Sequence, residues 1–346
     1  MNNNLSSLRV RDIGEQGLLE KLQRFCPPDI IGDDAAVLET LPNQSLIVTT
    51  DMLIDGVHFS DVTTSPEDAG WRAAAANLSD LAAMGATPVG ITVGLGLPPD
   101  VTVSWVERLY QGMTECLSKY HVKIVGGDIV RSPITTLSIT AFGQAYPDFI
   151  IRRATAQPED VIVVTGTHGG SRGGLELLLH PEIGQDLKPE AKTPLITAHQ
   201  RPNPRLDVIP ILKEIIISSS CSLPPAPWPI AGMDSSDGLA DAVLQICRAS
   251  QVGAVIESSK IPLPSAFEEW LTPEKSLEYA LYGGEDFELV LCLPLEPALK
   301  LVQKLGTGAA IIGTITPSST VILHHKKAEI PNQVLSLSQG FQHFGQ

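Results

Sequence analysis

Short apolar runs that are typical of β-strands alternate with segments of helical period along the first half of this chain. Residues 45–50 form a β-branched run that ends at Asp51. Ser65 and Pro66 then give the signal of a helix start, and apolar residues follow at the spacing of one helix face. Further strands are expected at residues 90–95, 122–125 and 135–143. This alternation indicates an α/β or α+β fold.

The pattern breaks around residues 146–160, where two prolines and the pair Arg152-Arg153 occur. We therefore expect two domains, residues 1–150 and 151–346. In the second, we expect a helix from about Leu175, a proline-rich loop over residues 222–230 and a helix that starts at Asp237. Strands are expected at residues 161–165, 253–257, 288–293, 310–315 and 320–323.

Charge and composition exclude several classes of protein. The net charge is −15, whereas a nucleic-acid partner requires a basic surface. No apolar run approaches the roughly 18 residues of a membrane span, and residues 1–10 lack the apolar core of a secretion signal. The five cysteines are scattered, with no CxxC pair. The sequence therefore favours a reduced, cytoplasmic protein that binds neither nucleic acid nor membrane.

Carboxylates recur in one setting, at the end of an apolar strand or beside glycine at a turn. They are Asp33, Asp34, Asp51, Asp80, Asp128, Asp234, Asp237, Glu285 and Asp286. A single aspartate of this kind is usually a turn or cap residue, but five separate aspartate segments, followed by Glu285-Asp286 in the same setting, are harder to explain in that way. Such oxygen ligands suit Mg²⁺ or Mn²⁺ better than zinc. Two like charges about 4 Å apart repel by about 4 kcal/mol at an effective dielectric near 20, so divalent cations would have to lie between these carboxylates and a triphosphate.

Other motifs are absent or ambiguous. The dipeptide Gly-Lys of a Walker A loop does not occur. Residues 169–173 fit G-x-S-x-G and make Ser171 the candidate nucleophile of a serine hydrolase, although a flexible glycine-rich turn explains them better. His58 follows Asp51 by seven residues and is a candidate substrate contact.

Taken together, the segments resemble the thiamine-monophosphate kinase family, within the superfamily of aminoimidazole ribonucleotide synthetase. The matching segments run in family order from about residue 12 to residue 344: IGDDAAV, TTDMLIDGVHF, NLSDLAAMGATP, IVGGD, DVIVVTGT, RPNPR, DSSDGL, YGGEDFEL and GFQHF. Two segments depart from the family pattern. Ile129-Val130 follows GGD where threonine is usual, and the turn THGGSRGG is unusually rich in glycine.

The resemblance implies a two-domain architecture of the aminoimidazole ribonucleotide synthetase type. An N-terminal α/β domain would bind ATP and magnesium, and its strands would pair across a homodimer. A C-terminal α+β domain would close the active site. The metal ligands that the family pattern implies are Asp34, Thr49, Thr50, Asp51, Asp80, Asp128, Asp234 and Asp237. The implied ATP contacts are Tyr110, Gly127, Arg153 and Ser236, and the implied thiamine contacts are His58, Glu285 and Phe341.

The implied reaction is magnesium-assisted transfer of the γ-phosphoryl group of ATP to thiamine monophosphate. The acceptor is a phosphate oxygen that is already ionised near neutral pH, so no general base is expected. Three alternatives remain at this point: another ATP-using member of the superfamily, the serine hydrolase, and a metal-binding protein without activity.

Overall fold

The computed structural model describes residues 8–28, 30, 35–36, 38–219, 228, 230–326 and 331–337. The chain divides into two compact units. The first comprises residues 1–81 and 87–145, and the second comprises residues 82–86 and 146–346. Among the described residues, no helix has both the length and the apolar character to cross a bilayer. Both units combine helices with a sheet, which confirms the mixed α/β and α+β class.

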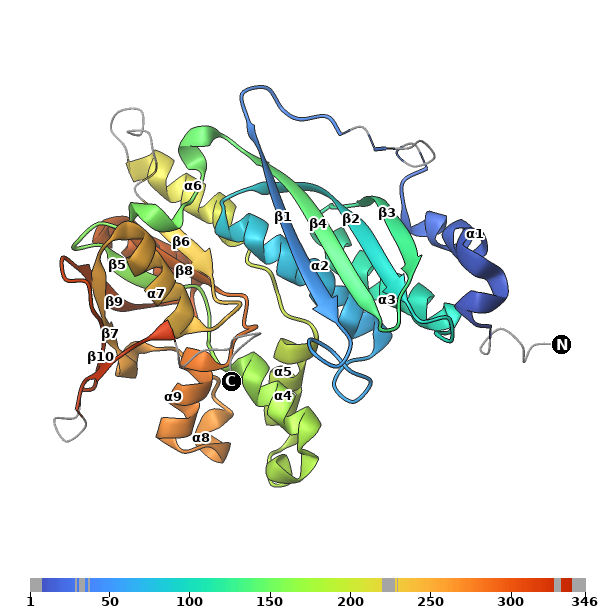
Figure 1. The fold of residues 1–346 in the computed structure, drawn as a ribbon. Helices are drawn as coiled ribbons and strands as arrows, with labels where there is room; N and C mark the ends of the chain where they lie inside the picture. The colour runs from blue at the N-terminus through green and yellow to red at the C-terminus, as the bar shows by residue number, and fades with distance from the viewer. Residues whose placement is uncertain are drawn as a thin grey trace. The chain divides into compact units, whose positions relative to one another are not determined.

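A four-stranded sheet in the order β1-β4-β2-β3 forms the centre of the N-terminal unit (Figure 1). Strands β1 (Ser45–Ile54) and β2 (Thr87–Leu97) each pair antiparallel with β4 (Thr136–Ala145). Strand β3 (Ile124–Arg131) pairs parallel with β2 after a crossover through a helix. Strands β1 and β2 are thus parallel to each other, which fits the helix that also connects them.

Helices α2 (Pro66–Ala83) and α3 (Val103–Ser118) lie against one face of this sheet, and α1 (Val10–Leu22) packs beside α3 (Figure 1). The two longer helices cross at a pair of glycines. A Cβ atom on Gly112 would lie 1.8 Å from the Glu67 carbonyl oxygen, and one on Gly70 would lie 1.9 Å from that of Leu109. The backbones can approach this closely only because both positions lack a side chain.

The pleat of β1 separates its residues between two environments. Leu53 is buried under the helices, whereas Leu46, Val48 and Met52 on the other face are 54%, 53% and 52% exposed. The sheet of the N-terminal unit therefore has one covered face and one face that is open in this chain.

A seven-stranded sheet in the order β11-β10-β7-β9-β5-β8-β6 forms the centre of the C-terminal unit. Its strands are β5 (Val161–Val164), β6 (Ala231–Asp234), β7 (Gly253–Glu257), β8 (Leu289–Leu293), β9 (Ala310–Thr316), β10 (Val321–His324) and β11 (Gln333–Val334). Neighbours pair antiparallel except for β7 and β10, which are parallel. Every residue of β5 and β8 is buried, so these strands are covered on both faces.

The helices of the C-terminal unit form three groups. Helices α7 (Leu239–Ser250) and α9 (Pro273–Tyr282) contribute to its main core, and α6 (Val208–Ser219) packs with α10 (Leu295–Leu305) beside β5 and β9. A smaller core joins α4 (Gly170–Leu179), α5 (Pro189–Gln200) and α8 (Phe267–Trp270) (Figure 1). The short 3-10 helices are η1 (Gln23–Phe25), η2 (Pro147–Phe149), η3 (Arg153–Thr155), η4 (Pro181–Gly184) and η5 (Ser258–Lys260).

Three expected boundaries were wrong. Strand β1 continues through Asp51 to Ile54, because its pairing with β4 continues to Thr136. Asp128 likewise lies inside β3 and does not follow its end. Helix α4 begins at Gly170 and not near Leu175. The proline-rich segment 222–230 is outside the described residues except at positions 228 and 230.

Candidate functional site

In the N-terminal unit, two predicted metal ligands of β1 face α2. The Thr49 hydroxyl donates a hydrogen bond to the Asp80 carboxylate, and the Asp51 backbone N–H donates to Asn77 Oδ1 at 3.2 Å. Asn77 is fully buried and also donates from its side chain to the Ala73 carbonyl at 3.0 Å. The sequence interpretation missed Asn77, although a polar residue among the alanines and leucines of this helix is the same signal that marked Asp80.

Two other predicted ligands lie on the open face of the same sheet. Thr50 is opposite Thr140 in the register, and their hydroxyl oxygens are 2.9 Å apart. Asp128 is exposed and lies opposite Gly94 on the neighbouring strand. Since adjacent residues of a strand point to opposite faces, Thr49 and Thr50 cannot contact the same atom through their side chains. The structure therefore places Thr49, Asp51 and Asp80 together and keeps Thr50 and Asp128 apart from them.

Three predicted ligand contacts of the N-terminal unit have different surroundings. His58 is half-buried in the turn after β1, and its Nδ1 accepts a hydrogen bond from the Ile54 N–H at 3.1 Å. Gly127 lies so close to β2 that a Cβ atom there would be 2.2 Å from the Val93 carbonyl oxygen. Tyr110 is only 5% exposed, and burial raises the pKa of its hydroxyl. A packing role thus accounts for Gly127 and Tyr110 whether or not they contact a ligand.

In the C-terminal unit, the segment DSSDGL runs from the last residue of β6 to the first residue of α7. Asp234 is 3% exposed, and its Oδ1 accepts a hydrogen bond from the Ser236 hydroxyl at 2.9 Å. Asp237 is exposed. The next residue, Gly238, has a φ of 105°, which lets the chain turn into α7. Two predicted metal ligands and one predicted ATP contact thus lie on one short connection.

A further acidic residue next to this connection is Asp241, in the first turn of α7. The pKa of Asp241 is raised above its usual value, mainly by burial and also by the charge of Asp237. The charge of Arg153 opposes this rise. Arg153 is exposed and lies in η3, which packs on α7. The sequence interpretation missed Asp241, although it follows Asp237 by one helical turn.

The segment YGGEDFEL also lies beside DSSDGL. The Glu285 N–H donates to the Ser236 carbonyl at 2.7 Å. Asp286 accepts from the backbone N–H groups of Gly169 at 2.7 Å and Ser171 at 3.0 Å, and so caps α4. This cap explains why α4 begins earlier than its apolar residues suggest.

A largely buried ion pair follows in the same segment, with side chains that are 12% exposed for Arg205 and 16% exposed for Glu288. Glu288 Oε2 accepts from Arg205 Nη1 and from the Thr165 hydroxyl, both at 2.5 Å. The guanidinium of Arg205 also donates to both carboxylate oxygens of Asp207, at 3.0 and 3.1 Å. The segment RPNPR therefore supplies the cation that neutralises a carboxylate next to the candidate site.

The serine-hydrolase alternative does not fit the geometry. Ser171 is 1% exposed and lies inside the first turn of α4, not at a sharp turn before it. Its hydroxyl is 3.2 Å from His199 Nδ1, and Glu285 Oε2 is 3.8 Å from the same nitrogen. A catalytic triad needs the serine and the carboxylate on opposite ring nitrogens. The glycines of this turn serve packing: a Cβ atom on Gly174 would be 2.0 Å from the Leu195 carbonyl oxygen of α5.

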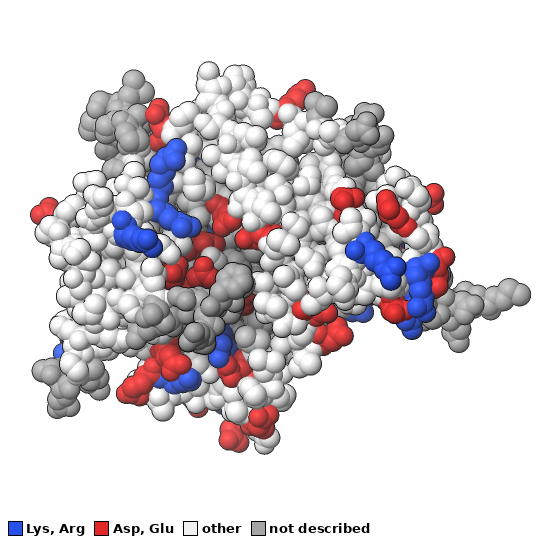
Figure 2. Space-filling view, in the orientation of Figure 1, with Lys and Arg blue, Asp and Glu red and all other residues white. Residues whose placement is uncertain are grey.

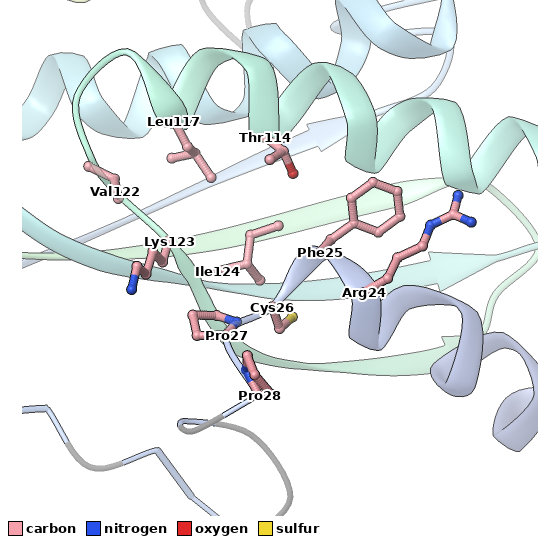
Figure 3. Close-up of a pocket in the computed structure, with 10 residues that line it drawn as sticks. All are labelled: Arg24, Phe25, Cys26, Pro27, Pro28, Thr114, Leu117, Val122, Lys123 and Ile124. Carbon is pink, nitrogen blue, oxygen red and sulfur yellow. The ribbon is translucent and has the colours of Figure 1, made fainter.

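A cavity of about 300 Å³ in the N-terminal unit contains none of the predicted site residues. Its lining includes Phe25, Cys26, Thr114 and Ile124, from η1 and the loop that follows it, α3 and β3 (Figure 3). Burial raises the pKa of the Cys26 thiol, which opposes formation of a reactive thiolate. This observation agrees with a structural role for the cysteine.

The charges on the surface agree with the sequence. On the face shown in Figure 2, lysine and arginine side chains of the described residues form small separate groups among many acidic ones.

No three histidine, cysteine, aspartate or glutamate side chains in the described part of the chain lie close enough to form a metal centre by themselves. Two predicted site residues, Asp34 and Phe341, lie outside the described residues.

Comparisons with known proteins show which family this chain resembles in each of its two halves. Profiles of the N-terminal and C-terminal domains of AIR synthase related proteins match residues 32–145 and 157–326. The curated thiamine-monophosphate kinase of Synechococcus elongatus is 51% identical over 341 residues, which cover 98% of this chain and 99% of the relative.

Solved structures agree as well. The thiamine-monophosphate kinase of Stenotrophomonas maltophilia K279a superposes with a TM-score of 0.75 at 32% identity, covering 89% of this chain and 95% of the other. A structure described as AaThiL complexed with AMPPCP and TMP superposes with a TM-score of 0.68 at 32% identity, covering 94% and 98%. With matches of this extent in both domains, the chain belongs to the thiamine-monophosphate kinase family of AIR synthase related proteins.

Proposed function

We propose that this protein transfers the γ-phosphoryl group of ATP to thiamine monophosphate and releases thiamine diphosphate and ADP. The observation that carries the proposal is the 51% identity to a thiamine-monophosphate kinase over 98% of the chain. The neighbour that was solved with AMPPCP and TMP, at 32% identity, supports the same pair of substrates. The acidic residues of both units provide the chemical setting that such a reaction needs.

Magnesium is the proposed cofactor. More than one ion is proposed, because Thr50 and Asp128 lie on the opposite face of the sheet from Thr49 and Asp51. The residues proposed to hold these ions are Thr49, Thr50, Asp51, Asp80, Asp128, Asp234 and Asp237, together with Asp34. The donor set fits, because carboxylate and hydroxyl oxygens are hard ligands and Mg²⁺ usually binds one or two carboxylates together with substrate phosphates. When bound, magnesium ions neutralise phosphate charge and align the reacting phosphates.

The remaining proposed contacts have roles that follow from their chemistry. Arg153 carries an exposed guanidinium, which suits a phosphate oxygen. The Ser236 hydroxyl, which donates to Asp234, is the second proposed ATP contact, with Gly127 and Tyr110 as the others. Glu285 would accept hydrogen bonds from the aminopyrimidine, and His58 and Phe341 would contact the thiamine moiety. No residue is proposed as a general base, because the acceptor oxygen is already ionised.

The homodimer is also a proposal. Leu46, Val48 and Met52 form an apolar strip on the open face of β1, and each is more than half exposed. Apolar groups that gather in this way on a sheet face are typical of an interaction surface. We assign dimerisation and ATP binding to residues 1–150, closure of the active site to residues 151–346, and the cytoplasm as the location.

The test is a product assay with purified protein, ATP, MgCl₂ and thiamine monophosphate, with EDTA as the control. We expect thiamine diphosphate and ADP in equal amounts, and neither when EDTA is present. Folded protein that binds ATP but forms no product would refute the proposed acceptor.

A matched pair of variants tests the metal assignment. Asp51→Asn should abolish turnover while the fold is retained, because only the charge of one carboxylate is removed. Asp61→Asn is the control, since Asp61 is exposed and lies in the same unit. Equal activity of the two variants would remove Asp51 from the set of proposed ligands.

A further inference from the structure

The turn that carries Glu285 has an unusual backbone. Gly284, Glu285 and Phe287 have φ angles of 67°, 57° and 53°. Residues other than glycine rarely adopt this left-handed region, and they remain there only where the surroundings hold them. Such conformations concentrate at functional sites.

On one side, backbone hydrogen bonds tie this turn to the segment after β6. The Glu285 N–H donates to the Ser236 carbonyl at 2.7 Å, and the Ser235 N–H donates to the Glu288 carbonyl at 2.9 Å. The Ser235 hydroxyl accepts from the Glu288 N–H at 3.2 Å. Ser235 and Ser236 thus keep contacts that do not involve Asp286.

On the other side, the Asp286 side chain ties the turn to α4. Both carboxylate oxygens are used: one accepts from Gly169 N–H at 2.7 Å and the other from Ser171 N–H at 3.0 Å. Protein atoms enclose the carboxylate although the residue as a whole is half-buried. These hydrogen bonds use two of the N–H groups at the start of α4, so a ligand phosphate would have to displace Asp286 to reach them.

The Glu285 carboxylate lies beside α5, the helix that packs against α4. Glu285 Oε2 lies 3.8 Å from Nδ1 of His199 on α5, and α5 packs closely against α4. A shift of the turn relative to α4 would therefore move Glu285 away from its neighbours on these helices.

We propose that Asp286 is a positioning residue that fixes Glu285 for contact with thiamine monophosphate by anchoring the strained turn to the N-terminus of α4. This inference rests on the proposed function, in which Glu285 contacts the substrate. Asp286 does not itself contact the substrate.

The test compares Asp286→Asn with Glu285→Gln in steady-state kinetics for both substrates. An asparagine offers one acceptor oxygen, so one of the two N–H groups loses its partner. We expect KM for thiamine monophosphate to rise by roughly tenfold, which is about the cost of losing one hydrogen bond between the Glu285 carboxylate and the substrate. KM for ATP should change by less than about twofold, since Ser235 and Ser236 keep their own hydrogen bonds.

The outcomes separate the two ideas. If Glu285→Gln raises KM for thiamine monophosphate and Asp286→Asn does not, the positioning role is wrong and the substrate contact stands. If neither variant changes this KM while product still forms, the role of Glu285 is wrong, and the inference is overturned with it. Equal rises in both KM values for Asp286→Asn would indicate a general structural role and would also overturn it. If this variant does not fold, Asp286→Ser, which keeps one short capping acceptor, is held to the same expectation.

Discussion

A substitution where α2 and α3 cross should lower the stability of the fold, as the interatomic distances at the crossing show. Replacing Gly112 with alanine would place a Cβ atom 1.8 Å from the Glu67 carbonyl oxygen and 2.6 Å from the Glu67 Cα. Both atoms belong to the backbone, so no side-chain rotation relieves the contact. The helices would have to separate by more than about 1 Å, which places the change among the overpacking substitutions.

Two terms of opposite sign decide the size of the effect. Alanine gains about 1 kcal/mol over glycine in a helix interior, whereas overpacking costs about 1–3 kcal/mol or more. Because the new Cβ atom would overlap backbone atoms, we take an overpacking cost of about 3 kcal/mol. The free energy of unfolding should then fall by about 2 kcal/mol. For a unit of this size, that loss lowers Tm by roughly 5–10 °C.

Thermal unfolding followed by circular dichroism measures this effect, with Gln111→Ala as the control. Gln111 is the exposed neighbour of Gly112, so its replacement should leave Tm within about 2 °C. Gly112→Ala should also reduce kinase activity, because α2 carries Asn77 and Asp80, which contact β1. A Tm equal to or above that of the wild type would refute the reasoning.

Two further predictions concern the C-terminal unit. Arg205→Met should destabilise the protein by about 3 kcal/mol, the lower end of the range for buried pairs, because the Glu288 side chain, which is 16% exposed, would remain largely buried without its cation. Urea denaturation measures this loss of stability. The control is Arg24→Met, at an exposed ion pair, which should cost less than about 1 kcal/mol. Similar losses for both variants would contradict the prediction. Burial raises the pKa of Asp286 from 3.8 to about 7, so this group binds its proton more tightly in the folded state. Its contribution to stability is therefore greatest below about pH 4 and decreases as the pH rises to about 7. Asp286→Asn should flatten that part of the stability curve, and an unchanged curve would show that Asp286 does not titrate in this range.

Local pattern predicted much of the fold. The strand and helix periods gave the mixed class, and the apolar runs that became β5 and β8 are buried on both faces as such runs suggest. The order of the acidic segments pointed to the family, which the comparisons with known proteins confirm. These features depend on neighbours in sequence, so the sequence contains them directly.

The ends of helices and strands were harder to predict from the sequence, because they depend on partners that are distant in the chain. Pairing with β4 extends β1 beyond Asp51, and a carboxylate more than a hundred residues away caps α4. The sequence interpretation treated Asp286 as one more acidic turn residue beside glycine. Its partners, Gly169 and Ser171, lie in a turn that sequence reasoning associated with a nucleophile or with flexibility.

By itself, the sequence determined which residue types are available: hard oxygen ligands beside turns, no Walker A lysine, and an apolar content sufficient for two cores. Only the tertiary structure decided which of them meet. It placed Thr49 and Asp51 on the covered face of a sheet, beside Asp80 of α2, and Thr50 and Asp128 on the open face. It also assigned Arg205 to Glu288 and Asp286 to α4. The reason is that residue type and period are local properties, whereas hydrogen-bond and ion partners depend on strand register and helix packing, which bring together residues far apart in the chain.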